Sequence, residues 1–195
     1  MHGMINRAFQ GFLVDTYGRE VWDEVRSVAQ LRFVDFEAML QYDDRLTLSC
    51  FDAARTLLHK HPNVLLEDLG TFLITHPPYA PLKRLLRFGG STLSDFLLSL
   101  DELPERGRMA MPNIEMPEIE VFAVDERTFQ LKARWVLPGI GPILLGALRA
   151  MADDYGALAT LSLDGFDGKK ECLHIDIFDT AHSKGNAFVL GEVPA

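Results

Sequence analysis

The chain has 195 residues, of which 48% are hydrophobic and 24% charged, and these values fit one ordinary globular domain with an adequate core. Its 19 basic and 28 acidic residues give a net charge of −9, which argues against nucleic acid and membranes as partners, because nucleic acid and anionic lipid both bind basic surfaces. Two cysteines, Cys50 and Cys172, are too few for a disulfide framework and predict buried thiols in a reducing compartment.

The chain shows no sign of membrane targeting. Its first residues lack the apolar run of a signal peptide, and its longest apolar stretches are far below the ~18 residues that a membrane span needs. We therefore expect a cytoplasmic protein.

In the first hundred residues, apolar side chains recur at steps of three and four, which is the period of a helix face. This spacing predicts successive helices near residues 5–16, 21–28, 44–61, 63–76, 81–87 and 92–103.

Proline and capping residues set the predicted helix boundaries. The third helix should stop at His61, because Pro62 pushes the residue before it out of helical geometry, and Asn63 should cap the next helix. Thr92 opens the sixth helix with a capping box, and Pro104 should end or kink that helix.

Beyond the proline-marked connector the apolar period changes to two, which is typical of half-buried strands. This alternation predicts antiparallel strands near 119–123, 129–137, 158–163 and 172–178, with a long apolar helix inserted from Gly139 to Tyr155. The resulting class is α+β, an N-terminal helical subdomain packed on a C-terminal antiparallel sheet. We expect one domain over residues 1–195, mainly helical over 1–110 and sheet plus helix over 111–195.

The sequence contains no glycine-rich phosphate loop, no Gly-x-Ser-x-Gly elbow and no His-Glu-x-x-His motif, so we predict that the chain is not an enzyme. Cys172, His174 and Asp176 share one strand face by the period of two. A small metal or catalytic site there stays open, although a half-exposed sheet face is the more ordinary explanation.

Several short motifs follow one another along roughly residues 1 to 180: Met1-His2-Gly3-Met4-Ile5, Tyr17-Gly18 with Trp22, Tyr42-Asp43-Asp44, Gly89-Gly90-Ser91-Thr92, Met111-Pro112 with Pro117, and Gly139-Ile140. In this order and spacing they resemble the haem–nitric oxide/oxygen binding (H-NOX) family. That family supplies the sensor domain of bacterial gas receptors and of soluble guanylate cyclases.

The resemblance implies a haem b between the N-terminal helices and the C-terminal subdomain. It places Ile5, Pro117, Leu144 and Leu145 at the apolar positions that line the family's haem pocket.

Two attachment motifs of the family differ in this chain. The histidine that ligates iron in the family follows a Leu-Asp-x-Leu segment, and Pro104 stands at that position. The family's propionate-binding Tyr-x-Ser-x-Arg motif falls on Ala133, Trp135 and Leu137, which are all apolar. These changes predict either haem held in an altered mode or another apolar ligand in the same pocket.

Methionine and histidine are both axial ligand types for haem iron. The residues considered as replacement iron ligands are His76, Met109 and Met111.

The resemblance therefore implies a stand-alone sensory and regulatory protein, in the family a haem-based sensor of nitric oxide or oxygen. Since no output domain follows residue 195, it should act in trans on a separate kinase or cyclic-nucleotide enzyme. The alternative is a haem-independent protein-interaction module on the same scaffold, which a surface patch in place of an occupied pocket would indicate.

Overall fold

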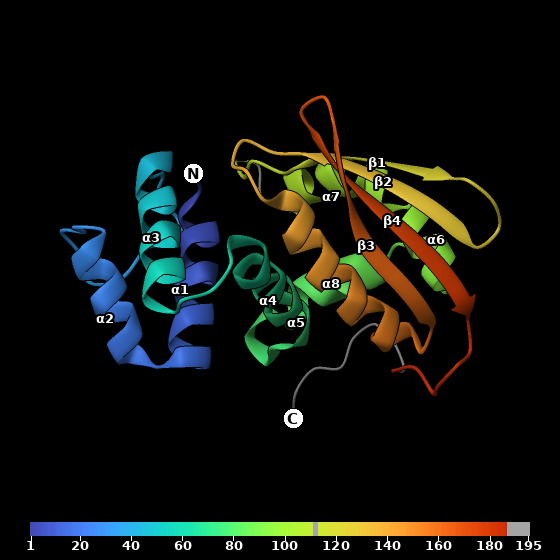
Figure 1. Cartoon of the computed structure of the whole chain (residues 1–195), viewed down its shortest axis with the longest axis horizontal. Coiled ribbons are helices and arrows are strands. Elements are labelled where there is room, and N and C mark those ends of the chain that lie inside the picture. The colour runs from blue at the N-terminus through green and yellow to red at the C-terminus, as the bar shows by residue number, and fades with distance from the viewer. Residues whose placement is uncertain (111–112, 187–195) are drawn as a thin grey trace.

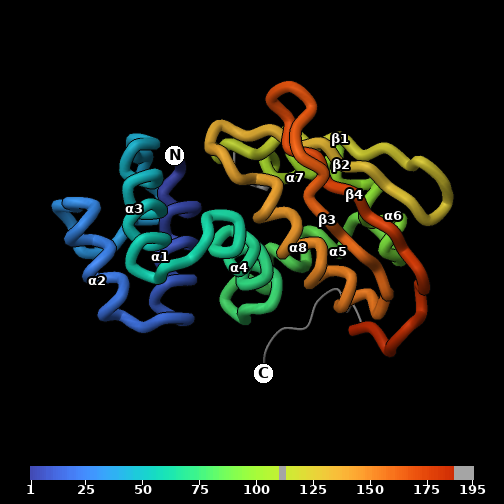
Figure 2. Tube along the Cα trace, in the orientation of Figure 1, coloured from blue at the N-terminus to red at the C-terminus, as the bar shows by residue number. Residues whose placement is uncertain are grey.

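Helices make up the first part of the chain. The computed structural model describes residues 1–110 and 113–186, whose path is traced in Figure 2. In chain order the helices and 3₁₀ turns are α1 (Gly3–Tyr17), α2 (Arg19–Val28), α3 (Asp44–Leu57), α4 (Pro62–Thr75), η1 (Pro77–Tyr79), α5 (Ala80–Arg87), α6 (Leu93–Leu98), η2 (Leu100–Glu102) and α7 (Leu103–Ala110). Figure 1 shows α1, α2 and α3 gathered at one end of the molecule as an N-terminal lobe. Across the described ranges, no helix has the length and apolar run that crossing a bilayer requires.

An antiparallel sheet and one long helix form the C-terminal lobe. Within the described residues the sheet has four strands in the order β1-β2-β4-β3, and the helix α8 follows β2 in the chain and packs beside the sheet (Figure 1). The elements are β1 (Glu118–Ala123), β2 (Thr128–Arg134), α8 (Ile140–Tyr155), β3 (Leu158–Asp167) and β4 (Lys170–Asp179). This arrangement confirms the predicted α+β class.

The N-terminal lobe has an aromatic core. The Trp22 indole is fully buried against Phe36, with 5.9 Å between ring centroids, and its N–H donates to the Val34 carbonyl oxygen at 3.1 Å. Cys50 of α3 lies in the same core, and burial raises the pKa of its thiol to about 12. The thiol is therefore protonated and unreactive at neutral pH.

The two faces of the sheet differ as the alternation in the sequence predicts. Leu131 and Ala133 of β2 are fully buried in the apolar core that β2 shares with α8. On the opposite face Lys132 pairs with the Asp167 carboxylate at 2.6 Å. One face of the sheet is therefore core and the other is exposed to solvent.

α4 packs Leu65 and Leu66 into the core of the N-terminal lobe and so belongs to that lobe, and the two lobes meet where α4 crosses α8. A Cβ atom added to Gly70 of α4 would collide with the Ile143 carbonyl oxygen, and one added to Gly146 of α8 would collide with the Glu67 carbonyl oxygen. The Thr71 hydroxyl donates to the Gly146 carbonyl oxygen at 3.3 Å. The crossing therefore brings backbone against backbone, which requires glycine at both positions.

Two helix boundaries differ from the prediction. α3 ends at Leu57 and not at His61, because the chain already turns at His59, whose φ is +52°. α4 begins at Pro62, with the His61 side chain as its cap, and His61 Nδ1 accepts the Asn63 amide hydrogen at an N···N distance of 3.3 Å. Proline fits this position, because the first helical N–H has no partner within the helix.

The predicted capping box of the sixth helix is confirmed. Thr92 Oγ1 accepts the Asp95 amide hydrogen at 3.1 Å, and the Asp95 carboxylate accepts the Thr92 amide hydrogen at 3.2 Å. The helix is shorter than expected, however: α6 ends at Leu98, and α7 begins at Leu103 with Pro104 in its first turn. Pro104 therefore stands at the start of a new helix, where its missing N–H costs nothing.

The second strand is also shorter than the alternation predicts. β2 ends at Arg134, so Trp135 and Leu137 lie in the connection to α8. The predicted strand over 129–137 was therefore too long at its C-terminal end, because regular pairing with β1 stops at Arg134.

A carboxylate from the sheet holds the N-terminal end of α8. Glu171 of β4 accepts hydrogen bonds from the amides of Gly139, Ile140 and Gly141, at 2.9, 3.1 and 3.1 Å. These N–H groups have no partners within the helix, and the helix dipole favours negative charge at this end. The contact joins α8 to β4.

We expect Gly70→Ala and Gly146→Ala each to lower the free energy of unfolding by about 1–3 kcal/mol, because the added methyl group meets a helical carbonyl oxygen that cannot move aside. Urea denaturation followed by circular dichroism measures the loss. Gly11→Ala in α1 is the matched control, since its methyl group meets only the Tyr79 hydroxyl at the end of a side chain that can rotate. Equal stability of the three variants would contradict the close crossing.

Replacing Glu171 should free the start of α8. We expect Glu171→Ala to lower the free energy of unfolding by about 1–2 kcal/mol, as loss of a helix cap does, and to speed hydrogen exchange at the Gly139, Ile140 and Gly141 amides. Glu126→Ala, in the exposed turn between β1 and β2, is the control and should change neither quantity. Unchanged exchange at these three amides in Glu171→Ala would show that the carboxylate does not hold the helix.

Candidate functional site

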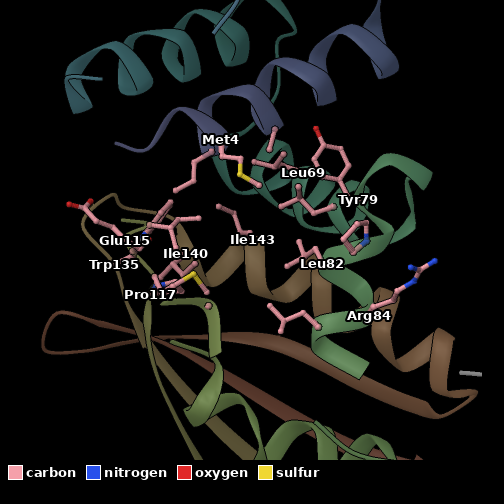
Figure 3. Close-up of a pocket in the computed structure, with 18 of the residues that line it drawn as sticks. Met4, Leu69, Tyr79, Leu82, Arg84, Glu115, Pro117, Trp135, Ile140 and Ile143 are labelled. Atoms are coloured by element: carbon pink, nitrogen blue, oxygen red, sulfur yellow. Dashed lines mark hydrogen bonds between the residues drawn. The ribbon is translucent and has the colours of Figure 1, made fainter. Parts of the chain in front are cut away.

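A cavity of about 810 Å³ lies between the N-terminal lobe and the C-terminal lobe, and we call it the interlobe cavity. Figure 3 shows it beneath α1, with Met4 on one side and Ile140 and Ile143 of α8 on the other. Its lining residues are Met4, Ile5, Ala8, Leu69, Leu73, Tyr79, Pro81, Leu82, Arg84, Leu85, Phe88, Gly107, Ile114, Glu115, Met116, Pro117, Trp135, Ile140 and Ile143.

Hydrocarbon covers nearly the whole inner surface of the interlobe cavity. Arg84 and Glu115 are the charged residues of the described lining, and both are exposed. Figure 3 shows them at opposite ends, with their charged groups directed away from the middle, which Leu82 and Ile143 occupy. The interior therefore offers no partner to a buried charge, which makes burial of a charge costly.

The phenol of Tyr79 adds no charge to this lining. Its hydroxyl lies close to Gly11 of α1, at one wall of the cavity. Burial raises the pKa of Tyr79, the Asp15 carboxylate raises it further, and Arg7 lowers it. Tyr79 is therefore uncharged at neutral pH.

Gly107 and Met116 belong to the lining, although the sequence did not single them out. A Cβ atom on Gly107 would lie 2.8–2.9 Å from three side-chain atoms of Met116. α7 can approach the segment before β1 this closely only because position 107 has no side chain. An isolated glycine inside a helix is the signal that points to such an approach.

The Trp135 indole forms another part of the wall. Its N–H donates to the Glu115 main-chain oxygen at 2.9 Å, so the end of β2 is tied to the segment before β1. Trp135 also lines a second cavity of about 360 Å³, beside Glu118 and Arg134. These two side chains form a salt bridge with a shortest N···O distance of 2.8 Å.

The structure divides the residues expected in the pocket between the cavity and the core. Ile5, Pro117 and Trp135 line the interlobe cavity. Leu144 and Leu145, which the resemblance places in the lining, are buried in the C-terminal core. The side of α8 that faces the cavity carries Ile140 and Ile143 instead.

Three positions that correspond to the haem-attachment motifs of the family lie outside the described lining of the interlobe cavity. Pro104 is in the first turn of α7, Ala133 is fully buried in the C-terminal core, and Leu137 is 9% exposed. Their side chains are apolar, so none of the three can donate to iron or to a carboxylate.

Of the residues considered as replacement iron ligands, His76 and Met109 also lie outside the described lining. His76 Nε2 is 3.0 Å from Asp15 Oδ2, and its ring stacks on Phe72 with 4.3 Å between centroids. Met109 is 84% exposed. Met111 falls outside the described residues.

The strand residues Cys172, His174 and Asp176 do not form a metal site. His174 Nε2 and Asp176 Oδ2 are 3.1 Å apart, while the buried Cys172 thiol lies near the Lys170 carbonyl oxygen. Over residues 1–110 and 113–186, no three His, Cys, Asp or Glu side chains gather closely enough to hold a metal ion.

A family model described as Haem-NO-binding matches residues 2–162, a range that runs from α1 into β3 and includes every described lining residue of the interlobe cavity. The chain belongs to the H-NOX family. The match confirms the resemblance seen in the sequence motifs. It also agrees with the prediction that the chain is not an enzyme, because this family is one of sensor domains.

Solved H-NOX structures share the fold of this chain. The unliganded Fe(II) H-NOX protein from K. algicida aligns with a TM-score of 0.79 at 16% identity, over 94% of this chain and 100% of that one. The Fe(II)NO state of an H-NOX protein from S. oneidensis aligns with a TM-score of 0.77 at 14% identity, over 92% of this chain and 100% of that one.

Curated relatives are much longer proteins. Soluble guanylate cyclase 89Db of Drosophila melanogaster is 20% identical over 158 residues, which are 81% of this chain and 24% of that protein. Soluble guanylate cyclase gcy-37 of Caenorhabditis elegans is 24% identical over 160 residues, which are 78% of this chain and 22% of that protein. The chain thus spans about a quarter of these relatives.

The lining of this H-NOX cavity does not fit a haem. Haem needs a ligand at iron and donors or cations for two propionates. Histidine and cysteine are absent from the described lining, and its one cation, Arg84, is exposed at the rim. Met4 and Met116 carry thioethers and Tyr79 a phenol, which are axial ligand types, although burial raises the pKa of Tyr79 and so disfavours the phenolate. For the two propionates, the described lining offers only the one positive charge of Arg84.

Replacing the Trp135 indole should loosen the cavity wall. Trp135→Phe keeps an aromatic ring but removes the N–H that the Glu115 oxygen accepts, so we expect a loss of about 1 kcal/mol in the free energy of unfolding and faster hydrogen exchange at amides 114–116. Trp22→Phe is the matched control, because it removes an indole hydrogen bond in the N-terminal lobe. It should lower stability without changing exchange at amides 114–116, and the same local exchange in both variants would contradict the role of Trp135.

Proposed function

We propose that this H-NOX chain is a sensory and regulatory domain in which a small ligand in the interlobe cavity sets how the two lobes pack. The observation behind this proposal is the position of the cavity. Ile5 on α1 belongs to the N-terminal lobe, whereas Trp135 and Ile140 belong to the C-terminal lobe, and all three line the same space. An occupant therefore touches both lobes at once.

Contact with both lobes gives a ligand the means to shift their arrangement. A ligand that binds one arrangement more tightly increases the population of that arrangement. Gln41 Nε2 donates to the Asn113 carbonyl oxygen at 3.3 Å, and this polar contact joins the segment before α3 to the segment before β1. We expect a change in lobe packing to alter it. The alternative of a haem-independent protein-interaction module, which a surface patch in place of an occupied pocket would indicate, has no comparable observation in its favour.

The output should pass to a separate signalling protein, a kinase or a cyclic-nucleotide enzyme. This part of the proposal rests on analogy with the curated relatives, which are named soluble guanylate cyclases and match this chain over about a quarter of their length. The net charge of −9 favours a protein partner over nucleic acid or an anionic membrane.

The test measures the activity of the partner enzyme with three forms of the chain. In the first the cavity holds its ligand, in the second the ligand has been removed, and in the third an added side chain fills the cavity. The chain as isolated and the chain stripped on a hydrophobic resin are each mixed with a kinase or a nucleotide cyclase from the same organism, and autophosphorylation or cyclisation is measured. We expect the rates to differ severalfold between the loaded and stripped forms, because occupancy changes the surface that the partner contacts.

Two variants make this test specific. Ala8→Phe places a ring in the cavity from α1, so the partner enzyme should have the same rate with the isolated and with the stripped form of this variant. Thr16→Phe adds the same ring to an exposed position of α1 and should behave like the parent chain. Equal rates of the partner enzyme with the isolated and the stripped parent chain would overturn the proposal.

A further inference from the structure

We infer that the interlobe cavity binds an uncharged, hydrocarbon-rich small molecule and not a porphyrin dicarboxylate. The inference rests on the proposed function, since it names the class of ligand that the same cavity takes. Three features lead to it: the charge of the lining, the state of the α8 N-terminal end, and the size and softness of the walls.

The charge of the lining excludes a dianionic ligand. Arg84 is the one cation of the described lining, and Glu115, at the other end, is an anion. Arg84 carries one positive charge and a haem carries two negative propionates, so at least one propionate charge is left without a countercharge in the described lining. A carboxylate left without a partner in this apolar interior costs several kcal/mol, and an uncharged ligand avoids that cost.

The N-terminal end of α8, next to the cavity, is closed to anions. Ile140 lines the cavity, and the free N–H groups at a helix start ordinarily attract an anion. Here the amides of Gly139, Ile140 and Gly141 already donate to the Glu171 carboxylate. That carboxylate supplies the negative charge which the helix end favours, and it repels a second one.

The size and softness of the cavity suit a ligand of some bulk. Its volume of about 810 Å³ lies within the range of roughly 300–1,000 Å³ that cavities for drug-sized ligands show. Met4 and Met116 contribute flexible thioether side chains to the lining, and methionine adapts to irregular apolar shapes.

Two matched probes test the charge preference directly. N-phenyl-1-naphthylamine is neutral, and 1-anilinonaphthalene-8-sulfonate has the same aromatic skeleton with one sulfonate, so their relative affinity isolates the effect of charge. Fluorescence titration of the stripped full chain should give saturable one-to-one binding of the neutral amine, about tenfold or more tighter than the sulfonate. Equal affinities, or no saturable binding of the amine, would overturn the inference.

Cavity-filling variants test whether the neutral probe binds in the interlobe cavity. Ala8→Phe and Ile5→Trp each fill space from α1 and should weaken binding of the neutral amine about tenfold or more, whereas Thr16→Phe should leave it unchanged. Circular dichroism checks the folding of each variant, and either filling variant alone is sufficient if the other fails to fold. Unchanged affinity in a folded filling variant would show that the probe binds elsewhere.

A titration with haemin can overturn this inference without overturning the proposed function. Titrated under the same conditions, haemin should give no stoichiometric Soret band. A stoichiometric band would overturn the inference while leaving the proposed function intact, and its loss in Met116→Ala would identify a thioether as the iron ligand. If the neutral amine binds tightly but the partner enzyme has equal rates with the isolated and the stripped chain, the proposed function is overturned and the inference about the ligand class stands.

Discussion

The close crossing of α4 over α8 is the contact on which the rest of the structure depends. Because Gly70 and Gly146 let the two backbones touch, each helix reaches both apolar cores: α4 places Ile74 in the C-terminal core, and α8 packs Ile143 against the N-terminal one. The interlobe cavity opens beside this crossing, where Leu69 and Ile143 reach its wall. A wider separation of the helices would change both cores and the cavity together.

The fold of the H-NOX family and the chemistry of its pocket depend on different residues in this chain. The glycine contacts at the helix crossing, the Thr92 capping box and the alternation of β2 are independent of any bound group. The lining can therefore lose polar and ligating side chains without loss of the scaffold. Pro104 illustrates this separation, since it is unable to bind a metal but is well suited to the first turn of α7.

Sequence reasoning succeeded where structure is local and failed where it depends on distant segments. The α8 helix with its end at Gly156, the capping box at Thr92 and the paired strands follow from short-range periodicity and hydrogen bonding. α8 is buried around most of its circumference, however, so periodicity alone did not show that Ile143, and not Leu144, faces the cavity. The approach of Met116 to Gly107 likewise depends on how two segments fold back on each other.

The three hydrogen bonds from α8 to Glu171 have a mechanical consequence. Glu171 belongs to β4 and is the register partner of Ala133 on β2, so one side chain links the start of α8 to the two inner strands of the sheet, close to their ends. Any tilt of α8 must either break these bonds or pull β4 with it. A ligand that tilts α8 without breaking these bonds would therefore also displace β4. Because β4 pairs with both β2 and β3, the displacement would reach the ion pair between Lys132 of β2 and Asp167 of β3 on the solvent-facing side of the sheet.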